Sequence, residues 1–402
     1  MKICLINNLY PPYARGGAEQ VVHRTVEGLR EKGYEVVLVT SMSGEKEIEE
    51  KQNLKIYRMY PRNIFFYTDA HRHNFFMRFI WHVIDMFNSS VCKEVKHILK
   101  QEQPDIVHTH NLMGLSFLIP RVVRKLQIKH VHTVHDVQLV EPSGIILKTK
   151  ENSWRYTGFP TKFYTWVMKQ LMGSPEVVIS PSQFLLDFYR SRGLFQGTQT
   201  ILLRNPLTLN FVRRKSAVKR RKDYGELFNF LYLGQIEEHK GVFLLAEAFE
   251  KVKNAKLHIV GDGSKLDELK NIVTENNLEN IEFYGRVDRD KLPELFSHID
   301  MTIVPSLCYE NSPTVIFESL YFDVPVLASR IEGIAELIEE GKNGFTFETG
   351  DLESLQEKME WCIEHVVDIK KMELKTPTLM RSEGEYVTSL ISLYTGHTDD
   401  TL

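Results

Sequence analysis

The sequence lacks closely spaced cysteines and lacks an excess of charge of either sign. Its four cysteines, Cys4, Cys92, Cys308 and Cys362, form no C-x-x-C pair. They therefore indicate neither a zinc site nor a disulfide framework, and they favour a reducing cytoplasm. Fifty Lys and Arg against 53 Asp and Glu leave a formal charge of -3. Because a nucleic-acid-binding domain is normally strongly basic, we expect no nucleic-acid partner.

Long hydrophobic segments are also lacking. No uncharged apolar run approaches the ~20 residues that a membrane-spanning helix needs. The chain opens on a strand-like segment, Met1 to Ile6, without a charged leader, so no secretory signal is expected. These absences predict a cytoplasmic protein that does not cross a membrane.

The sequence does contain short apolar runs that alternate with helical patterns. Residues 18–32 carry one apolar stripe, and Gly33 follows as a helix stop. Strand–helix alternation predicts an α/β protein with parallel sheets covered by helices. The expected strands are residues 2–7, 35–40, 105–109, 130–134, 176–180, 228–233, 256–260, 281–284, 301–304 and 326–328.

A basic segment near the middle predicts two domains. Seven of the ten residues from Arg213 to Lys222 are Lys or Arg, which is typical of a solvated linker, although a binding patch is the alternative. We therefore expect a Rossmann-like domain over residues 1–210, a linker over 211–224 and a second Rossmann-like domain over 225–380. A helix within residues 381–402 is expected to cross back to the first domain. Ligands of such sheets bind at the carboxyl ends of the strands.

The first strand is followed by a glycine loop that opens a helix. Gly16 and Gly17 would let the backbone approach a ligand, and the first N–H groups of the helix would favour a phosphate. A flexible turn without a ligand is the alternative.

Residues 310–318, Glu-Asn-Ser-Pro-Thr-Val-Ile-Phe-Glu, are the most informative segment. Ser312 and Pro313 predict the N-cap and the first residue of a helix. Glu310 would then precede the helix and Glu318 would lie inside it. A carboxylate can bind sugar hydroxyls, and a helix N-terminus favours a diphosphate.

Lys240 lies in the loop after the strand at residues 228–233. A nucleoside diphosphate leaves as a polyanion, so a cation must stabilise the departing charge. Lys240 is the candidate for that cation.

Together these segments resemble glycosyltransferase family 4, retaining enzymes of the GT-B fold. The matching motifs are Gly16–Glu19, His132–Asp136, Val260–Gly263, the E-x7-E pair Glu310 and Glu318, and Pro325–Ser329. The resemblance covers nearly the whole chain. It implies two Rossmann-like, doubly wound domains facing a central cleft, with the acceptor on the first domain and the donor on the second.

The resemblance also implies roles for individual residues. Lys240 would bind the donor diphosphate, Glu310 the donor sugar and Glu318 the ribose. His135 would lie beside the reacting sugar and Asp136, on the acceptor side, would orient it, so the catalytic set is His135, Lys240 and Glu310. The other donor-binding candidates are Gly16, Gly17, Gln235, Gly261, Arg286, Asn311, Ser312, Pro313, Thr314 and Val315. Family members need no bound metal, so we expect neither a metal nor a cofactor.

The chain departs from the family pattern at Gln235, where an arginine is usual. Gln donates a hydrogen bond but carries no charge, and Arg15 or Arg286 would have to supply the missing cation. Asp323 stands where a glycine is common, and Asp tolerates a left-handed turn.

Three further patterns are compatible with binding of a metal or a dinucleotide, but each has another interpretation that we favour. Asp288-Arg289-Asp290 fits a D-x-D metal motif, but helix capping is the favoured interpretation. Gly261-Asp262-Gly263 lacks the third glycine of a dinucleotide fold. Histidines crowd two strand ends and admit zinc, but we favour packing for all except His135; they are His108, His110, His130, His132 and His135.

Aromatic and basic residues alternate over residues 62–81 and 154–166. Such a mixture suits a membrane interface, and helix core with basic side chains at its edge is the equal alternative. Peripheral contact with the inner face of the membrane would favour a lipid-linked acceptor.

The function predicted from these patterns is retaining, metal-independent transfer of a sugar from a UDP- or GDP-sugar to a saccharide or lipid-linked saccharide. Capsule, exopolysaccharide and lipid-linked glycan assembly all fit. A nucleotide-sugar epimerase or hydrolase of the same fold, and a non-catalytic nucleotide-sugar-binding protein, are the alternatives.

Overall fold

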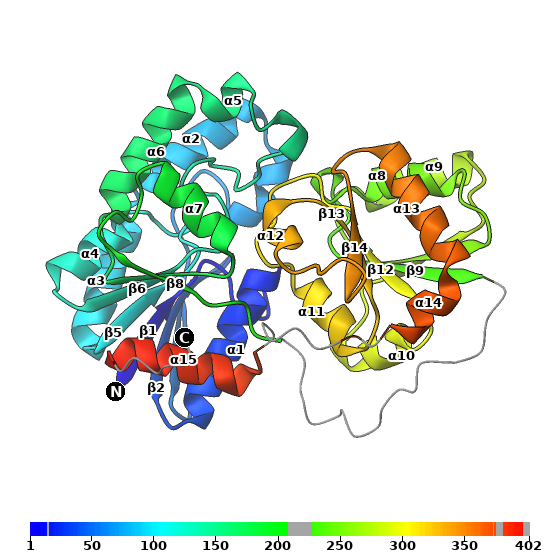
Figure 1. The fold of residues 1–402 in the computed structure, drawn as a ribbon. Coiled ribbons are helices and arrows are strands. Elements are labelled where there is room, and N and C mark those ends of the chain that lie inside the picture. Colours follow the sequence, from blue (N-terminus) through cyan, green and yellow to red (C-terminus); the bar gives the residue numbers. More distant parts are fainter. Residues whose placement is uncertain (14–15, 208–226, 373, 375–380, 397–402) are drawn as a thin grey trace. The chain divides into compact units, whose positions relative to one another are not determined.

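The structure, a computed structural model, describes residues 1–13, 16–207, 227–372, 374 and 381–396. The chain divides into two compact units (Figure 1). Unit 1 comprises Met1–Gly144, Ser153–Pro206 and Arg381–Leu402, and unit 2 comprises Ile145–Asn152 and Leu207–Met380. The predicted basic linker, residues 211–224, lies outside the described residues.

Unit 1 is built on a sheet whose described strands run in the order β3-β4-β2-β1-β5-β6-β7-β8. β3 pairs antiparallel with β4, and all other neighbours are parallel. The strand order reverses between β1 and β5, which makes this the topological switch point of the sheet. The strands are β1 (Lys2–Ile6), β2 (Glu35–Ser41), β3 (Glu47–Lys51), β4 (Leu54–Met59), β5 (Ile106–Thr109), β6 (Lys129–Thr133), β7 (Val177–Ser180) and β8 (Gln199–Leu202).

Helices cover this sheet and bury its strands. Ile3 and Leu5 of β1 pack in one core cluster with residues of α1 and α15, while Cys4 and Ile6, on the alternate face, are equally buried. α15 packs on α1 so closely that a Cβ at Gly28 would lie 2.7 Å from Val387. The helices of unit 1 are α1 (Gly17–Glu31), α2 (Phe75–Met86), α3 (Ser89–Glu102), α4 (Ile119–Lys125), α5 (Trp154–Thr157), α6 (Phe159–Met172), α7 (Gln183–Ser191), α15 (Glu383–Thr395) and the 3-10 turn η1 (Tyr67–Arg72).

Unit 2 is built on a parallel sheet with the described strand order β11-β10-β9-β12-β13-β14. Its switch point lies between β9 and β12. The strands are β9 (Phe228–Leu233), β10 (Ala255–Val260), β11 (Ile281–Gly285), β12 (Met301–Val304), β13 (Val326–Ser329) and β14 (Gly344–Phe347).

Both faces of this second sheet are also covered. Phe230 of β9 packs in one cluster with Phe249 of α8, and Leu231, on the alternate face, packs in another with Phe296 of α10. The helices of unit 2 are α8 (Val242–Phe249), α9 (Leu266–Glu275), α10 (Leu292–Phe296), α11 (Thr314–Tyr321), α12 (Glu332–Ala335), α13 (Leu352–Glu364), α14 (Val366–Lys371) and the 3-10 turns η2 (Lys148–Lys150), η4 (Glu238–Lys240) and η5 (Arg289–Lys291).

The predicted α/β class with two doubly wound parallel sheets is confirmed. Gly33 ends α1 with a φ of 82°, and Asp323 adopts the expected left-handed conformation with a φ of 58°. Within the described residues, no helix is both long enough and apolar enough to span a bilayer.

Candidate functional site

In unit 1, the loops that follow β1 and β5 are joined at the carboxyl edge of the sheet. The Asn111 backbone N–H donates to Asn7 Oδ1 at 3.1 Å, and Asn8 Nδ2 donates to the Met113 carbonyl at 3.0 Å. These asparagines lie at the switch point, where doubly wound sheets bind their ligands.

The glycine loop leads from this edge into α1. Gly16 occupies the N-cap position in an extended conformation, and its N–H donates to the Glu19 carboxylate at 2.8 Å. Gly17 is the first helical residue. The Gly16 amide therefore has an internal partner, and a phosphate would have to replace it or use Gly17. Arg15, a predicted source of cationic charge, lies outside the described residues.

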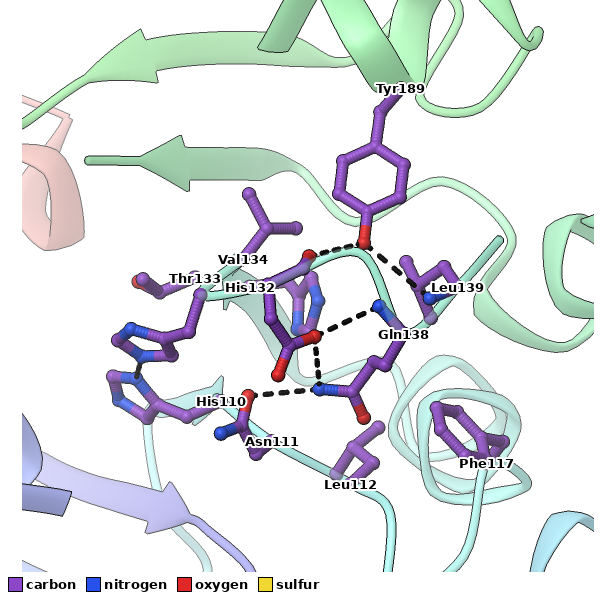
Figure 2. A pocket seen from close by; sticks show the side chains of 12 residues that line it. His110, Asn111, Leu112, Phe117, His132, Thr133, Val134, Gln138, Leu139 and Tyr189 are labelled. Carbon is purple, nitrogen blue, oxygen red and sulfur yellow. Dashed lines mark hydrogen bonds between the residues drawn. The ribbon is translucent and has the colours of Figure 1, made fainter. Parts of the chain in front are cut away.

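The loops after β5 and β6 line a small pocket. Gln138 crosses this pocket and donates from Nε2 to Asn111 Oδ1 at 3.0 Å (Figure 2). The lining residues are His110, Asn111, Leu112, Phe117, His132, Thr133, Val134, His135, Asp136, Gln138, Leu139 and Tyr189. The structure thus brings His135 and Asp136 into one pocket.

Asp136 is held by the chain that follows it. Its Oδ1 accepts from the backbone N–H of Gln138 at 2.9 Å and from Gln138 Nε2 at 3.0 Å. Burial raises the pKa of Asp136 to about 6, the Gln138 hydrogen bonds act against this rise, and the charge of Glu19 adds to it. The carboxyl is therefore ionised at neutral pH and protonated in mild acid.

His135 is paired with a second histidine. Its Nε2 lies 3.0 Å from Nδ1 of His110, and the two rings stack with centroids 5.3 Å apart. Burial lowers the pKa of His135 to about 4, and burial together with the neighbouring histidines lowers the pKa of His110 well below its ordinary value. Both rings are thus neutral at neutral pH. The sequence assigned His110 to packing, but the structure places it in the pocket beside His135.

Each of the other three histidines contacts at least one hydroxyl group. His108 contacts the hydroxyls of Tyr394 and Thr133 at 2.6 and 2.7 Å. His130 and His132 both contact Thr109 Oγ1 at 2.8 Å.

The sheet register separates these histidines into two groups. His132 pairs with Thr109 and His108 with Val131, so His130 and His132 lie on the opposite face from His108. Among the residues that the structure describes, no three His, Cys, Asp or Glu side chains are placed to hold a metal ion.

In unit 2, Lys240 and Glu310 form an ion pair at the switch point of the sheet. Lys240 Nζ contacts Glu310 Oε1, and Ser306 Oγ donates to the same oxygen at 3.1 Å. Lys240 ends η4, after β9, and Glu310 follows β12. Because parallel neighbouring strands end at the same edge, residues 70 positions apart meet there.

Charge balance keeps Lys240 protonated. Burial alone would lower the pKa of Lys240, but the charge of Glu310 acts in the opposite direction and the pKa is raised overall. The site therefore holds a full positive charge next to a carboxylate.

Glu318 lies inside α11 and is almost completely buried. Its Oε1 lies 3.4 Å from Nη2 of Arg289. Arg289 lies in the Asp288-Arg289-Asp290 segment, for which the sequence predicted helix capping and no ion pair with Glu318.

Asp288 occupies the position before η5, but its side chain makes no cap hydrogen bond, so the predicted capping contact is absent. Arg286 is exposed after the edge strand β11.

α11 begins one residue later than predicted. Pro313 is the N-cap, with a ψ of 123°, and Thr314 is the first helical residue. The extended backbone at Pro313 explains the difference. Asn311 and Ser312 are buried before the helix, and Val315 follows Thr314 in its first turn.

Glycines allow close backbone contacts at two loops of unit 2. A Cβ at Gly333 of α12 would lie 2.0 Å from the Glu310 carbonyl oxygen, and one at Gly261 would lie 1.8 Å from the Gly234 carbonyl oxygen. The backbone of Gly261 thus packs against the Gly234–Gln235 turn. Gln235 itself is exposed, and its carbonyl accepts from the Tyr232 hydroxyl at 2.5 Å. The sequence pattern alone did not single out Gly333.

Residues 145–152, which belong to unit 2, support the chain just before Glu310. Lys148 N donates to the Leu307 carbonyl at 2.8 Å, and Tyr309 N donates to the Ile146 carbonyl at 2.9 Å. The Tyr309 hydroxyl donates to Glu151, and Lys148 pairs with Glu332. No sequence signal indicated these contacts, because they join residues between 158 and 184 positions apart.

Two family descriptions match the chain. "Glycosyltransferase Family 4" matches residues 15–206, and "Glycosyl transferases group 1" matches residues 214–373. An uncharacterised 42.6 kDa protein of the cps region of Klebsiella pneumoniae is 27% identical over 339 residues, which cover 84% of this chain and 87% of the relative.

Solved structures share the fold at low identity. Sucrose-phosphate synthase from Thermosynechococcus elongatus has a TM-score of 0.76 at 18% identity and covers 98% of both chains. The Anabaena protein HepE, in complex with UDP and glucose, has a TM-score of 0.69 at 18% identity and covers 98% of this chain and 99% of its own.

These matches define the chain as a glycosyltransferase with the two-domain GT-B fold. It belongs to glycosyltransferase family 4, as the sequence motifs predicted.

Proposed function

We propose that this glycosyltransferase moves a sugar from a UDP- or GDP-sugar to a hydroxyl group of a saccharide or lipid-linked saccharide, with retention of configuration and without a metal ion. The observation that carries the proposal is the Lys240–Glu310 ion pair at the switch point of unit 2. The relative in a cps region supports a role in building a polysaccharide.

The donor half of the reaction needs a cation and a hydrogen-bond acceptor, and unit 2 offers both. A diphosphate would compete with Glu310 for the charge of Lys240. Glu310, still held by Ser306, would then be able to accept hydrogen bonds from sugar hydroxyls. Because the site holds its charges before the reaction begins, it stabilises the leaving group without reorganisation.

Gln235 supplies no second positive charge, but Arg289 lies close to the other carboxylate. Its guanidinium is 3.4 Å from Glu318, the residue proposed to bind the ribose. This cation offsets the carboxylate charge that would otherwise repel a diphosphate. Arg289 therefore joins Arg15 and Arg286 as a candidate for the charge missing at Gln235.

The pocket of unit 1 offers groups suited to the reacting sugar. His135 is neutral at neutral pH because burial lowers its pKa to about 4, so it can exchange hydrogen bonds with a hydroxyl without carrying charge. Asp136 is ionised at neutral pH and is held in place by Gln138. We assign His135 a position beside the reacting sugar, and we assign Asp136 the role of orienting that sugar.

The proposed chemical step uses few protein groups. The acceptor hydroxyl oxygen bonds to the anomeric carbon on the face from which the diphosphate leaves, and the bond between that carbon and the phosphate oxygen breaks. The hydroxyl proton passes to an oxygen of the leaving phosphate. Lys240 stabilises the departing charge, and Glu310 positions the sugar without bonding to it.

Ligand binding to the folded chain tests the donor assignment first. Thermal unfolding with UDP, GDP, ADP, CDP and their sugars, with and without EDTA, should give a higher midpoint for one base. Saturation at a hundredfold excess over Kd adds ~2.7 kcal/mol of stability. UDP comes first because the HepE structure contains UDP. A shift that EDTA abolishes would contradict metal independence, and no shift at millimolar ligand would contradict the donor site.

Replacement of Lys240 tests the catalytic assignment. Lys240→Ala should lower turnover by roughly 10²–10³, the cost of losing one preorganised donor. Lys265→Ala is the matched control, because Lys265 is more exposed and pairs with Glu268 within the same helical turn. Sugar transfer measured with the donor that shifts the midpoint decides the result. Near-wild-type turnover in Lys240→Ala would exclude the proposed role.

A further inference from the structure

Helix α2 in unit 1 exposes its apolar side to solvent. The exposed fractions of Phe75, Phe76 and Phe79 are 78%, 68% and 57%, and Val83 and Phe87 continue the same stripe at helical spacing. A helix on the surface of a soluble protein normally places its apolar stripe against the core. In α2 the apolar stripe faces solvent instead of the core.

The inner side of α2 is fixed to the rest of unit 1. Trp81 Nε1 donates to the Phe65 carbonyl at 2.8 Å. Asp85 accepts from the Gly114 backbone N–H, at 3.0 Å to one carboxylate oxygen and 3.1 Å to the other. Trp81 and Asp85 are both buried. Because these contacts fix the rotation of the helix about its axis, the phenylalanines cannot turn inward without breaking them.

A second apolar stripe lies on α5 and α6. Trp154, Phe159, Phe163 and Trp166 are between 54% and 75% exposed. The rings of Phe159 and Phe163 stack at 6.1 Å, and those of Phe163 and Trp166 stack at 5.9 Å. The opposite side of α6 is buried. The rings therefore form a continuous row on the outer side of the helix.

Both stripes belong to unit 1, and Figure 1 shows α2, α5 and α6 in the same part of that unit. We call the two stripes together the aromatic surface: Phe75, Phe76, Phe79, Val83, Phe87, Trp154, Phe159, Phe163 and Trp166.

The exposed charges on these helices are all basic. Arg78, Arg155, Lys162 and Lys169 are exposed, while residues 70–84 and 154–172 contain no Asp or Glu. Asp85, the one acidic residue of α2, points inward to Gly114. The exposed charges that α2, α5 and α6 themselves carry are therefore basic, and one of them, Arg155, pairs with the buried Glu141.

We propose that the aromatic surface docks on a lipid bilayer that contains anionic lipids. Phenylalanine and tryptophan rings enter the interfacial region of a bilayer, and Lys and Arg remain at the headgroups. Each basic residue near an anionic leaflet adds to the attraction. A second copy of the chain fits less well, because a symmetric contact would bring the same positive charges together.

Co-sedimentation of the full chain with vesicles tests this proposal. We expect weak binding to phosphatidylcholine and strong binding to phosphatidylcholine mixed with phosphatidylglycerol. The variant Lys162→Glu/Lys169→Glu should lower partition into the mixed vesicles at least about 30-fold. Phe79→Ser/Phe163→Ser/Trp166→Ser should lower it at least roughly 100-fold.

Matched control variants separate the surface from general effects. Ile48→Ser removes an apolar side chain that is 60% exposed on β3, and Lys253→Glu reverses an exposed charge in unit 2. Both should bind vesicles like the wild type. All variants should keep their thermal unfolding midpoints, because the replaced side chains are exposed.

Tryptophan quenching adds a direct readout. Brominated lipids should quench the fluorescence of the wild type, and Trp154→Phe/Trp166→Phe should lose most of that quenching while still sedimenting. The proposal is overturned if the wild type stays in the supernatant with mixed vesicles, or if the three-aromatic variant binds them normally. Self-association that disappears in the aromatic variant, without vesicle binding, would assign the surface to a second copy instead.

Discussion

The ionisation of Asp136 should set the acidic limit of activity. Burial raises its pKa to about 6, so the carboxylate is present above that pH and is lost as the pH falls through it. If the carboxylate orients the sugar, kcat/KM should fall about tenfold per pH unit below pH 6. Asp136→Asn should lower the plateau and remove this limb.

Asp105→Asn is the matched control for Asp136, because Asp105 precedes β5 at the opposite edge of the same sheet and binds the Lys2 backbone N–H. Its pH profile should equal that of the wild type. An unchanged acidic limb in Asp136→Asn would show that another group controls it.

At the scale of single residues, the sequence predicted which side chains follow the central strands but not all of their partners. His135 and Asp136 share a pocket, and Lys240 meets Glu310. The contacts of His110 and Arg289 were missed, because a pattern in one segment does not show which distant side chain lies opposite. The roles assigned to these residues stay predictions until activity is measured.

The turn that carries Lys240 depends on a glycine with no room for a side chain. Gly241 has a φ of 74°, and a Cβ there would lie 1.8 Å from the Pro305 carbonyl oxygen. Gly241→Ala should therefore combine left-handed strain with a backbone clash. We expect a loss of at least about 3 kcal/mol of unfolding free energy, together with weaker donor binding.

Gly341→Ala isolates the strain from the clash. Gly341 has a φ of 72°, but a Cβ there would meet nothing within 4 Å. This variant should lose only about 1–2 kcal/mol and should bind donor normally. Denaturant titration of both variants measures the difference, and equal losses would mean that the turn can move away from Pro305.

At the scale of elements, the ten expected strands are present, and the described residues contain four more that were missed. Apart from the half-exposed edge strand β11, the expected strands are apolar runs buried on both faces, which is the pattern of a central parallel strand. β3 is a largely exposed acidic edge strand, and β8 is a four-residue, partly exposed edge strand. β14 is four residues long, and β4 contains the buried Arg58, whose Nη2 donates to the Pro11 carbonyl at 2.7 Å. Short or polar strands give too little periodicity to be recognised.

The whole molecule should lose stability as the pH falls from about 6.5 to 4. Burial lowers the pKa of His108 and His130 to about 3 and that of His135 to about 4, and those of His110 and His132 lie well below 6.5. The unfolded chain therefore binds up to five more protons on these groups in that range, so stability is present above pH 6.5 and is lost on acidification.

Two buried acids act in the opposite direction. Burial raises the pKa of Asp85 to about 7 and that of Asp136 to about 6, so the folded chain binds up to two more protons on them. Burial also lowers the pKa of His82, His239 and His258 to about 4, while it raises the pKa of Glu383. The histidines are therefore dominant, and we expect Tm to fall by roughly 5–10 °C between pH 6.5 and 5. Calorimetry of His108→Gln/His130→Gln should show a shallower slope, with exposed His71→Gln as the control. A Tm independent of pH would contradict this balance.

The chain passes from one unit to the other after Gly144, Asn152, Pro206 and Met380. The contiguous segment from residue 1 to 206 therefore contains Ile145–Asn152, which binds the Leu307–Tyr309 loop of unit 2. A chimaera that joins the first half of one relative to the second half of another would bring a foreign segment against that loop. A chimaera designed to change donor specificity should therefore take residues 145–152 and the second half of the chain from the same parent protein.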